Sequence, residues 1–223
     1  MRLDNRAQWS DSYRWNLTRG NTEGRELVVE THFARHVRTL SLTDDERQIV
    51  IGSLLGDGSL TPTTCGCSFR VHHGLQQRIY VEWKFKMLSR FVRTSPRVSG
   101  NGCYFRTVSH PEFAQLRRWF YPLGRKVVPF ALLAGELRAL GLAVWIMDDG
   151  SLDGKQLRLN TQCFSEAENR NLVGLLRAKF GISVSLNSDK GRVRLRCNAA
   201  SVARLVSLVR PHFIPSMLYK LPP

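Results

Sequence analysis

The segment that decides how the chain is interpreted is Leu142-Ala143-Val144-Trp145-Ile146-Met147-Asp148-Asp149-Gly150. Its apolar run predicts a buried helix, and the two carboxylates and the glycine that follow predict the end of that helix. The C-terminal end of a helix carries partial negative charge, so an acidic residue is unfavourable there unless a cation lies beside it. We therefore expect a cation close to the end of this helix.

A second segment repeats this arrangement nearer the N-terminus. A capping box that begins at Thr43 predicts the start of a helix, whose apolar run ends in Asp57-Gly58-Ser59-Leu60. The same four residues recur as Asp149-Gly150-Ser151-Leu152. Within the first segment, Gly52 and Gly56 share one helical face, where the missing side chains permit close approach of another helix.

Each segment is also followed by a lysine close to a proline. Lys126 lies 69 residues after Asp57, and Lys220 lies 71 residues after Asp149. Because several features recur at similar offsets, the chain contains an internal duplication.

The duplication predicts an α+β fold built from two halves, each with the element order αββαββα. We place a basic extension at 1–40, the first half at 41–130 and the second half at 131–223. Alternation of polar and apolar residues and helix start signals predict the elements. The predicted strands are 68–72, 103–108, 156–163 and 192–197, the predicted helices are 76–91, 112–120, 165–181 and 202–209, and a turn is predicted at 99–102.

Composition points to a polyanionic partner. The formal net charge is +15 and 43% of the residues are hydrophobic, which is typical of a folded protein that binds nucleic acid rather than membrane. Neither a signal peptide nor a run of transmembrane length is evident, so we expect an intracellular protein of an organelle or a bacterial cytoplasm. The five cysteines lack zinc-site spacing and are expected to be reduced thiols. The Arg-rich residues 1–40 are either an arm that contacts phosphates or an extension packed by its aromatic residues.

Strand alternation predicts which polar side chains share a face. Along 156–163 and 192–197, arginine, glutamine and asparagine side chains face away from the apolar residues. These side chains match base edges in the major groove, although a solvated outer face is the common alternative. The predicted DNA-contacting residues are Arg70, His72, Arg97 and Arg106 in the first half and Gln156, Arg158, Asn160, Gln162, Arg192, Arg194 and Arg196 in the second.

Asp57 and Asp149 are the candidate catalytic residues. Asp-Gly is common in surface turns, and that alternative applies to each aspartate alone. If the two helices pack together, however, their carboxylates come close and repel each other unless divalent cations lie between them. Oxygen ligands and water suit Mg²⁺, and such a site suits metal-assisted hydrolysis of a phosphodiester. Lys126 and Lys220 could then stabilise charge on the phosphoryl group.

These segments resemble the two signature helices of the LAGLIDADG homing endonucleases, of the monomeric two-motif type. The resemblance extends to His73–Leu88, to Leu159-Asn160-Thr161-Gln162-Cys163-Phe164-Ser165 and to the ending Ile214–Pro222. It covers about 41–223 and leaves 1–40 outside.

The resemblance implies a saddle-shaped monomer with pseudo-twofold symmetry, whose antiparallel sheets lie in the major groove of double-stranded DNA. It implies a Mg²⁺-dependent double-strand break in a long asymmetric site, which promotes mobility of the host intron, with Mn²⁺ or Ca²⁺ able to replace Mg²⁺ for binding. Asp57 and Asp149 would bind metal and catalyse, the carbonyls of Gly56 and Asp148 would add metal contacts, and Lys126 and Lys220 would be the active-site lysines.

The chain departs from the family motif at four positions. Leu55 and Met147 replace the usual first acidic residue, Asp148 stands where a small residue is typical, and Val144 replaces a glycine. None of these removes a required acid, so activity is favoured. Two alternatives remain: an RNA maturase that helps its own intron to splice, and a non-catalytic DNA-binding regulator.

Overall fold

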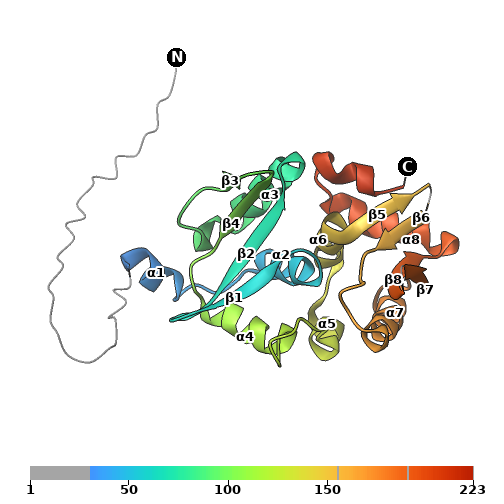
Figure 1. The fold of residues 1–223 in the computed structure, drawn as a ribbon, viewed down its shortest axis with the longest axis horizontal. Helices are drawn as coiled ribbons and strands as arrows, with labels where there is room; N and C mark the ends of the chain where they lie inside the picture. The colour runs from blue at the N-terminus through green and yellow to red at the C-terminus, as the bar shows by residue number, and fades with distance from the viewer. Residues whose placement is uncertain (1–30, 155, 190, 223) are drawn as a thin grey trace, which may run out of the picture.

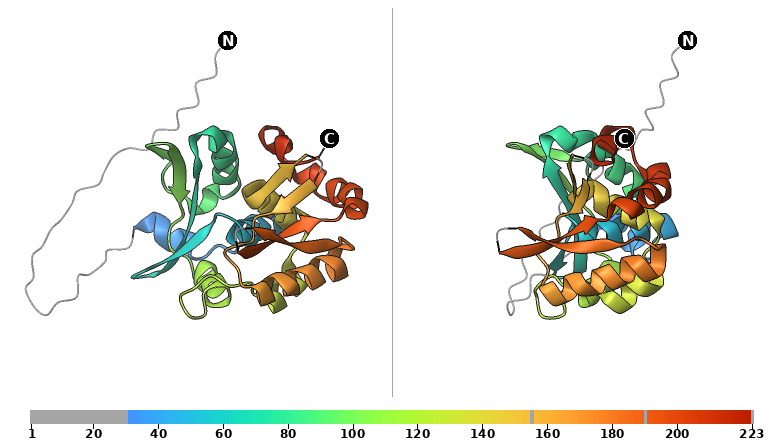
Figure 2. Two further views of the ribbon diagram at one scale, coloured as in Figure 1. Left: turned by 45° about the vertical axis from the view of Figure 1, so that its right-hand side comes forward. Right: turned by 90° about the vertical axis from the view of Figure 1, so that its right-hand side faces the viewer.

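The computed structural model describes residues 31–154, 156–189 and 191–222. They form two α+β halves, each with a four-stranded antiparallel sheet. Helices α2 and α6 pack against each other in the middle, and the sheets lie on either side of them (Figures 1 and 2).

The first half follows the predicted order of elements. A short helix α1 (His32–Val37) precedes it, and the 3-10 helices η1 (Leu75–Gln77) and η2 (Ser89–Phe91) flank its middle helix. The strands are ordered β1-β2-β4-β3. The elements are α2 (Asp44–Leu55), β1 (Ser59–Thr63), β2 (Gly66–Gly74), α3 (Arg78–Met87), β3 (Arg97–Ser99), β4 (Gly102–Arg106) and α4 (Pro111–Phe120).

The second half repeats this order, which confirms the predicted α+β fold of two αββαββα units. Helix α5 (Phe130–Glu136) leads into it, and η3 (Arg210–His212) and η4 (Pro215–Lys220) follow it. Its strands are ordered β5-β6-β8-β7, in the same relative arrangement as in the first half. The elements are α6 (Ala139–Asp149), β5 (Gly150–Asp153), β6 (Gln156–Leu159), α7 (Glu166–Phe180), β7 (Val184–Asp189), β8 (Arg192–Cys197) and α8 (Ala199–Val209).

Local signals in the sequence explain where the long helices begin and end. Thr43 and Ser165 each accept a hydrogen bond from the backbone of the glutamate three residues later, and each glutamate side chain accepts one back. Gly181 ends α7 in the left-handed conformation (φ 65°), which favours glycine.

Some predicted strand limits were wrong. The strand predicted at 156–163 ends at Leu159, because the Thr161 N–H donates to the Leu159 carbonyl and turns the chain. Part of the predicted turn at 99–102 belongs to β3 and β4. No strand was predicted at the positions of β1, β3, β5 and β7.

Glycines set the distance between α2 and α6, as predicted. A Cβ on Gly52 would lie 2.3 Å from the Gly141 carbonyl oxygen, and one on Gly56 would lie 2.4 Å from the Asp148 Cβ. The crossing is asymmetric, because Val144 occupies the position in α6 that corresponds to Gly52 and the close contact moves to Gly141. Almost the whole of α6 is buried, because it packs against α2 on one side and also contacts α8, η3 and η4.

Each sheet has a buried face and an outward face. In the first sheet, Phe69 and Phe105 pack against α4 and α3 through contacts with Phe113 and Phe85. All five cysteines are free thiols in the described part of the chain. Within the same residues, every helix is too short or too polar to cross a bilayer.

Candidate active site between the two halves

The paired helices bring the two candidate acids to one place. Asp57 directly follows Gly56, the C-cap of α2, and Asp149 is the last residue of α6. Because Gly56 packs on Asp148, the ends of both helices meet. The negative charge of Asp57 contributes to the raised pKa of Asp149, so the two carboxylates are electrostatically coupled.

Asp57 has a partly solvated carboxylate held from one side. Its side chain is 48% exposed, and its Oδ2 lies 3.4 Å from Nδ1 of His73. Its backbone N–H donates to Oδ2 of Asp148 at 3.3 Å. Burial alone would raise the pKa of Asp57, but the hydrogen bond and charge of His73 and the charges of Lys84 and Lys220 lower it.

The pKa of Asp149 is shifted in the opposite direction from that of Asp57. Burial, followed by the negative charges of Asp57 and Asp148, raises the pKa of Asp149 to about 7, and Lys126 and Lys220 oppose this rise only in part. Two coupled carboxylates of this kind match the hard oxygen ligands that a divalent cation prefers. Among the described residues no three His, Cys, Asp or Glu side chains are arranged to hold a metal ion, so other oxygen atoms would have to complete the coordination.

A lysine lies at the C-terminal end of each motif helix. Lys126 Nζ donates to the carbonyls of Gly56 at 2.6 Å and Gly58 at 3.0 Å. Lys220 Nζ donates, at 2.6 Å each, to the carbonyls of the two residues that precede Asp149. These ammonium groups neutralise the negative end of each helix dipole, which is the cation expected from the sequence. Burial lowers the pKa of both lysines, and the neighbouring acids partly offset this effect.

Asp148 belongs to a buried polar network that joins the halves. Its Oδ1 accepts hydrogen bonds from Lys84 Nζ and Tyr80 Oη, both at 2.6 Å. His73 Nε2 lies 3.4 Å from the same lysine nitrogen. Both Asp148 and Lys84 have fully buried side chains, so each charge requires the other. The Asp148 carboxylate thus anchors α6 to α3 beside Asp57.

Sequence reasoning missed this network. Lys84 lies four residues after Tyr80 and four before Leu88, on the buried side of α3, where an unpaired lysine would be costly. The corresponding signal for its partner was Asp148, an acid at a position where the family motif typically has a small residue.

The second half has a neutral pair at the corresponding place. The strand registers pair Ser59 with Arg70 and Ser151 with Arg158, which makes Thr161 the counterpart of His73. Thr161 Oγ1 donates to Oδ1 of Asn169 at 2.5 Å, and both side chains are buried.

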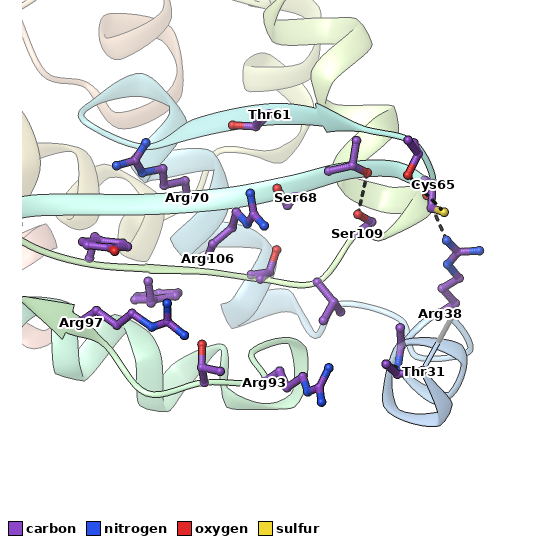
Figure 3. A pocket seen from close by; sticks show the side chains of 18 of the residues that line it. Thr31, Arg38, Thr61, Cys65, Ser68, Arg70, Arg93, Arg97, Arg106 and Ser109 are labelled. Carbon is purple, nitrogen blue, oxygen red and sulfur yellow. Dashed lines mark hydrogen bonds between the residues drawn. The ribbon is translucent and has the colours of Figure 1, made fainter. Parts of the chain in front are cut away.

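The predicted DNA-contacting residues of the first half share the outward face of its sheet. Arg70 pairs in register with Arg106, and Tyr104 lies between His72 and Arg97 in register. All four predicted side chains, Arg70, His72, Arg97 and Arg106, are exposed. Figure 3 shows the three arginines on one side of the sheet.

Most of the second-half candidates also lie on one face. Arg158 pairs in register with Arg196, and Arg194 Nη1 donates to Asn160 Oδ1 at 3.4 Å. Arg158 also forms an ion pair with Asp153. Gln156 and Arg192 begin their strands and are exposed, whereas Gln162 lies beyond β6 in the loop that leads to α7.

Comparison with known proteins decides the family. Residues 47–205 match the sequence profile of the LAGLIDADG DNA endonuclease family. The chain belongs to this family. A solved structure of the homing endonuclease I-WcaI bound to its DNA recognition sequence has a similar fold, with a TM-score of 0.80, 23% identity, and coverage of 87% of this chain and 94% of that one. The homing endonuclease I-DmoI in complex with DNA and Mn is more distant, with a TM-score of 0.53, 12% identity, and coverage of 77% of this chain and 99% of that one.

The curated relatives of this chain have several names. Protein RecA of Mycobacterium shimoidei is 32% identical over 91% of this chain, which spans only 50% of that protein. Probable intron-encoded DNA endonuclease 3 of Mycosarcoma maydis is 34% identical over 53% of this chain and 92% of that protein. The cytochrome b mRNA maturase bI2 of Debaryomyces hansenii is 28% identical over 78% of this chain and 72% of that protein. The chain therefore spans about half the length of the RecA proteins that it matches.

Proposed function

We propose that this LAGLIDADG protein is a site-specific homing endonuclease that makes a double-strand break in a long asymmetric DNA site. The observation that carries the proposal is the junction of α2 and α6, where Asp57 and Asp149 are coupled and a lysine lies beside each helix end. Each half contributes one acid and one lysine, as cleavage of two strands requires. A single chain therefore suffices, and the proposed enzyme acts as a monomer inside the cell.

Mg²⁺ is the proposed cofactor, held by the carboxylates of Asp57 and Asp149. The raised pKa of Asp149 supports a cation here, because a divalent ion would relieve the repulsion between the two acids. When bound, the metal would supply an activated water and neutralise charge on the scissile phosphate. The carbonyls of Gly56 and Asp148 already accept hydrogen bonds from lysines, so any metal contact by them would compete with Lys126 and Lys220.

The chain's own residues orient the site. His73 and the Asp148 side chain hold Asp57 by its carboxylate and its backbone N–H. Lys126 and Lys220 fix the carbonyls beside the acids and place positive charge next to them, where it can stabilise a phosphoryl group. The two basic sheet faces would bind DNA on either side.

A second candidate function is that of an RNA maturase. Its support is the match to the bI2 maturase, which covers more than two thirds of both chains. The paired acids favour the nuclease, because splicing assistance does not require them.

Cleavage of a selected target tests the proposal. The chain is incubated with a library of randomised duplexes in Mg²⁺, cut molecules are sequenced, and the recovered site is tested with Mg²⁺ and with EDTA. A double-strand break that needs the metal is expected. Absence of any cut site, together with accelerated splicing of the host intron RNA, would favour the maturase instead.

A further inference from the structure

The outward face of the first sheet contains a cavity of about 700 Å³ with a strongly cationic lining (Figure 3). Its walls come from α1, the β1–β2 hairpin, β4 and the segment that precedes β3. No carboxylate lines it among the described residues, and its arginines are Arg38, Arg70, Arg93, Arg97 and Arg106. Arginine guanidinium groups and hydroxyls without competing acids favour an anionic, oxygen-rich ligand.

Helix α1 closes one end of this cavity. It is docked there, because Arg38 Nη2 donates to the Cys65 carbonyl at 3.1 Å and Val37 is fully buried. The helix precedes residues 47–205, which match the family profile. Helix α1 therefore forms a wall of the cavity from a part of the chain that lies outside the residues matched by the family profile.

Ser68 provides an independent sign of a ligand. The residue is 1% exposed, and its Oγ has no hydrogen-bond partner among the described residues. It pairs in register with Thr61 and lies on the same face as Arg70, in the lining of the cavity. A buried hydroxyl without a partner is costly, so an acceptor such as a phosphate oxygen would stabilise it.

The cavity lies at the far end of the strand from the candidate acids. Strand β1 begins at Ser59, two residues after Asp57, and runs outward to Thr63 and the hairpin at Cys65. At about 3.4 Å per residue, the far wall is on the order of 15 Å beyond Ser59, which corresponds to about four or five base pairs.

We propose that Arg38, Arg93 and Ser68 bind the phosphodiester backbone of the target at the outer end of the first half. This inference rests on the proposed DNA-binding function and adds a flank contact to it. Phosphate contacts fix position without reading bases, so the cavity would extend the footprint rather than the sequence specificity.

The second half offers no equivalent wall in the described residues. Helix α5 precedes α6 as α1 precedes α2, but it packs against α7. The α7 residue Lys179 donates to the Ala134 carbonyl of α5 at 2.6 Å. The proposed phosphate contacts in the cavity therefore lengthen the DNA footprint on the side of the first half.

The test measures binding of a selected duplex that is shortened stepwise from either end. The variants are Arg93→Ala and Arg38→Ala/Arg93→Ala, and the control is Arg118→Ala, which removes one exposed charge from α4. The duplex is the cleavage target or, if the chain does not cut, one selected by binding, so failure of the nuclease proposal leaves this test intact.

Wild type is expected to lose affinity when base pairs are removed from one particular end, and the double variant to be insensitive to that removal. The slope of log K against log[KCl] should fall by about 0.9 for each phosphate that a variant no longer neutralises, and the control should keep the wild-type flank dependence. Equal flank dependence in wild type and double variant would overturn the proposal. The proposal would also be overturned if Arg93→Ala weakened binding to an RNA duplex of matching sequence but left binding to the DNA duplex unchanged.

Discussion

The two halves share an element order and differ in how each holds its acid. In the first half, Asp57 is partly exposed and is held by His73, next to the buried pair of Lys84 and Asp148. In the second, Asp149 is more enclosed, and Thr161, the counterpart of His73, donates its side-chain hydrogen bond to the neutral Asn169. The pKa of Asp57 is lowered and that of Asp149 is raised to about 7.

This difference shows that pseudo-symmetry of the backbone does not impose symmetry on the site. One residue accounts for much of it, because Asp148 belongs to the second half but directs its carboxylate into the first. Gly56, its counterpart in α2, has no side chain and leaves room for it. A duplicated scaffold can thus give two electrostatically distinct acids.

The largest effect is expected from Lys84→Met. This change leaves the buried Asp148 carboxylate without its cation, which typically costs about 3–5 kcal/mol of stability. Urea unfolding monitored by circular dichroism measures the loss. The double variant Lys84→Met/Asp148→Ala should be more stable than Lys84→Met alone, because it removes both charges. The exposed Lys86→Met should change stability by less than about 0.5 kcal/mol. A Lys84→Met variant as stable as wild type would mean that the first half does not depend on the ion pair.

A smaller loss is expected from Gly52→Ala. The added methyl would lie 2.3 Å from a backbone carbonyl of α6, so the helices must separate, at a cost of about 1–3 kcal/mol. Gly174→Ala in α7 is the matched control, because its methyl meets nothing within 4 Å and should stabilise the helix by about 0.5–1 kcal/mol. Thermal melts of both variants should shift in opposite directions. Melting-temperature shifts of the same sign and size in both variants would argue against close packing of α2 on α6 as the contact that holds the halves together.

A further effect is expected in the pH dependence of stability. Between about pH 4 and pH 7, folded Asp149 retains a proton that the unfolded chain has released, because its pKa is raised to about 7. The free energy of unfolding should therefore fall with rising pH in metal-free buffer, and Asp149→Asn should reduce that fall. Mg²⁺ at pH 8 should stabilise wild type more than this variant. The exposed Asp45→Asn should behave like wild type in both experiments, and an unchanged pH profile for Asp149→Asn would contradict the raised pKa.

The sequence predicted the repeated features and left the contacts between the halves undetermined. The capping boxes, the glycines of α2 and the Asp-Gly-Ser-Leu repeats are local patterns, so they located the motif helices and the acids. The Asp148 network joins residues more than sixty positions apart, and the cavity beside α1 depends on where residues 31–38 dock. Neither arrangement has a periodic signature. The early end of β6 also depends on one buried turn, at Thr161.

Cleavage by Asp57→Asn and by Asp149→Asn tests the central claim most directly. Each change removes a metal-binding charge while keeping nearly the same shape, so DNA binding should stay within a few-fold of wild type. We predict that both variants fail to make a double-strand break at the selected target in Mg²⁺, as judged by linearisation of a plasmid that carries it. If both variants linearise the plasmid at the wild-type rate, the two aspartates are not the catalytic acids.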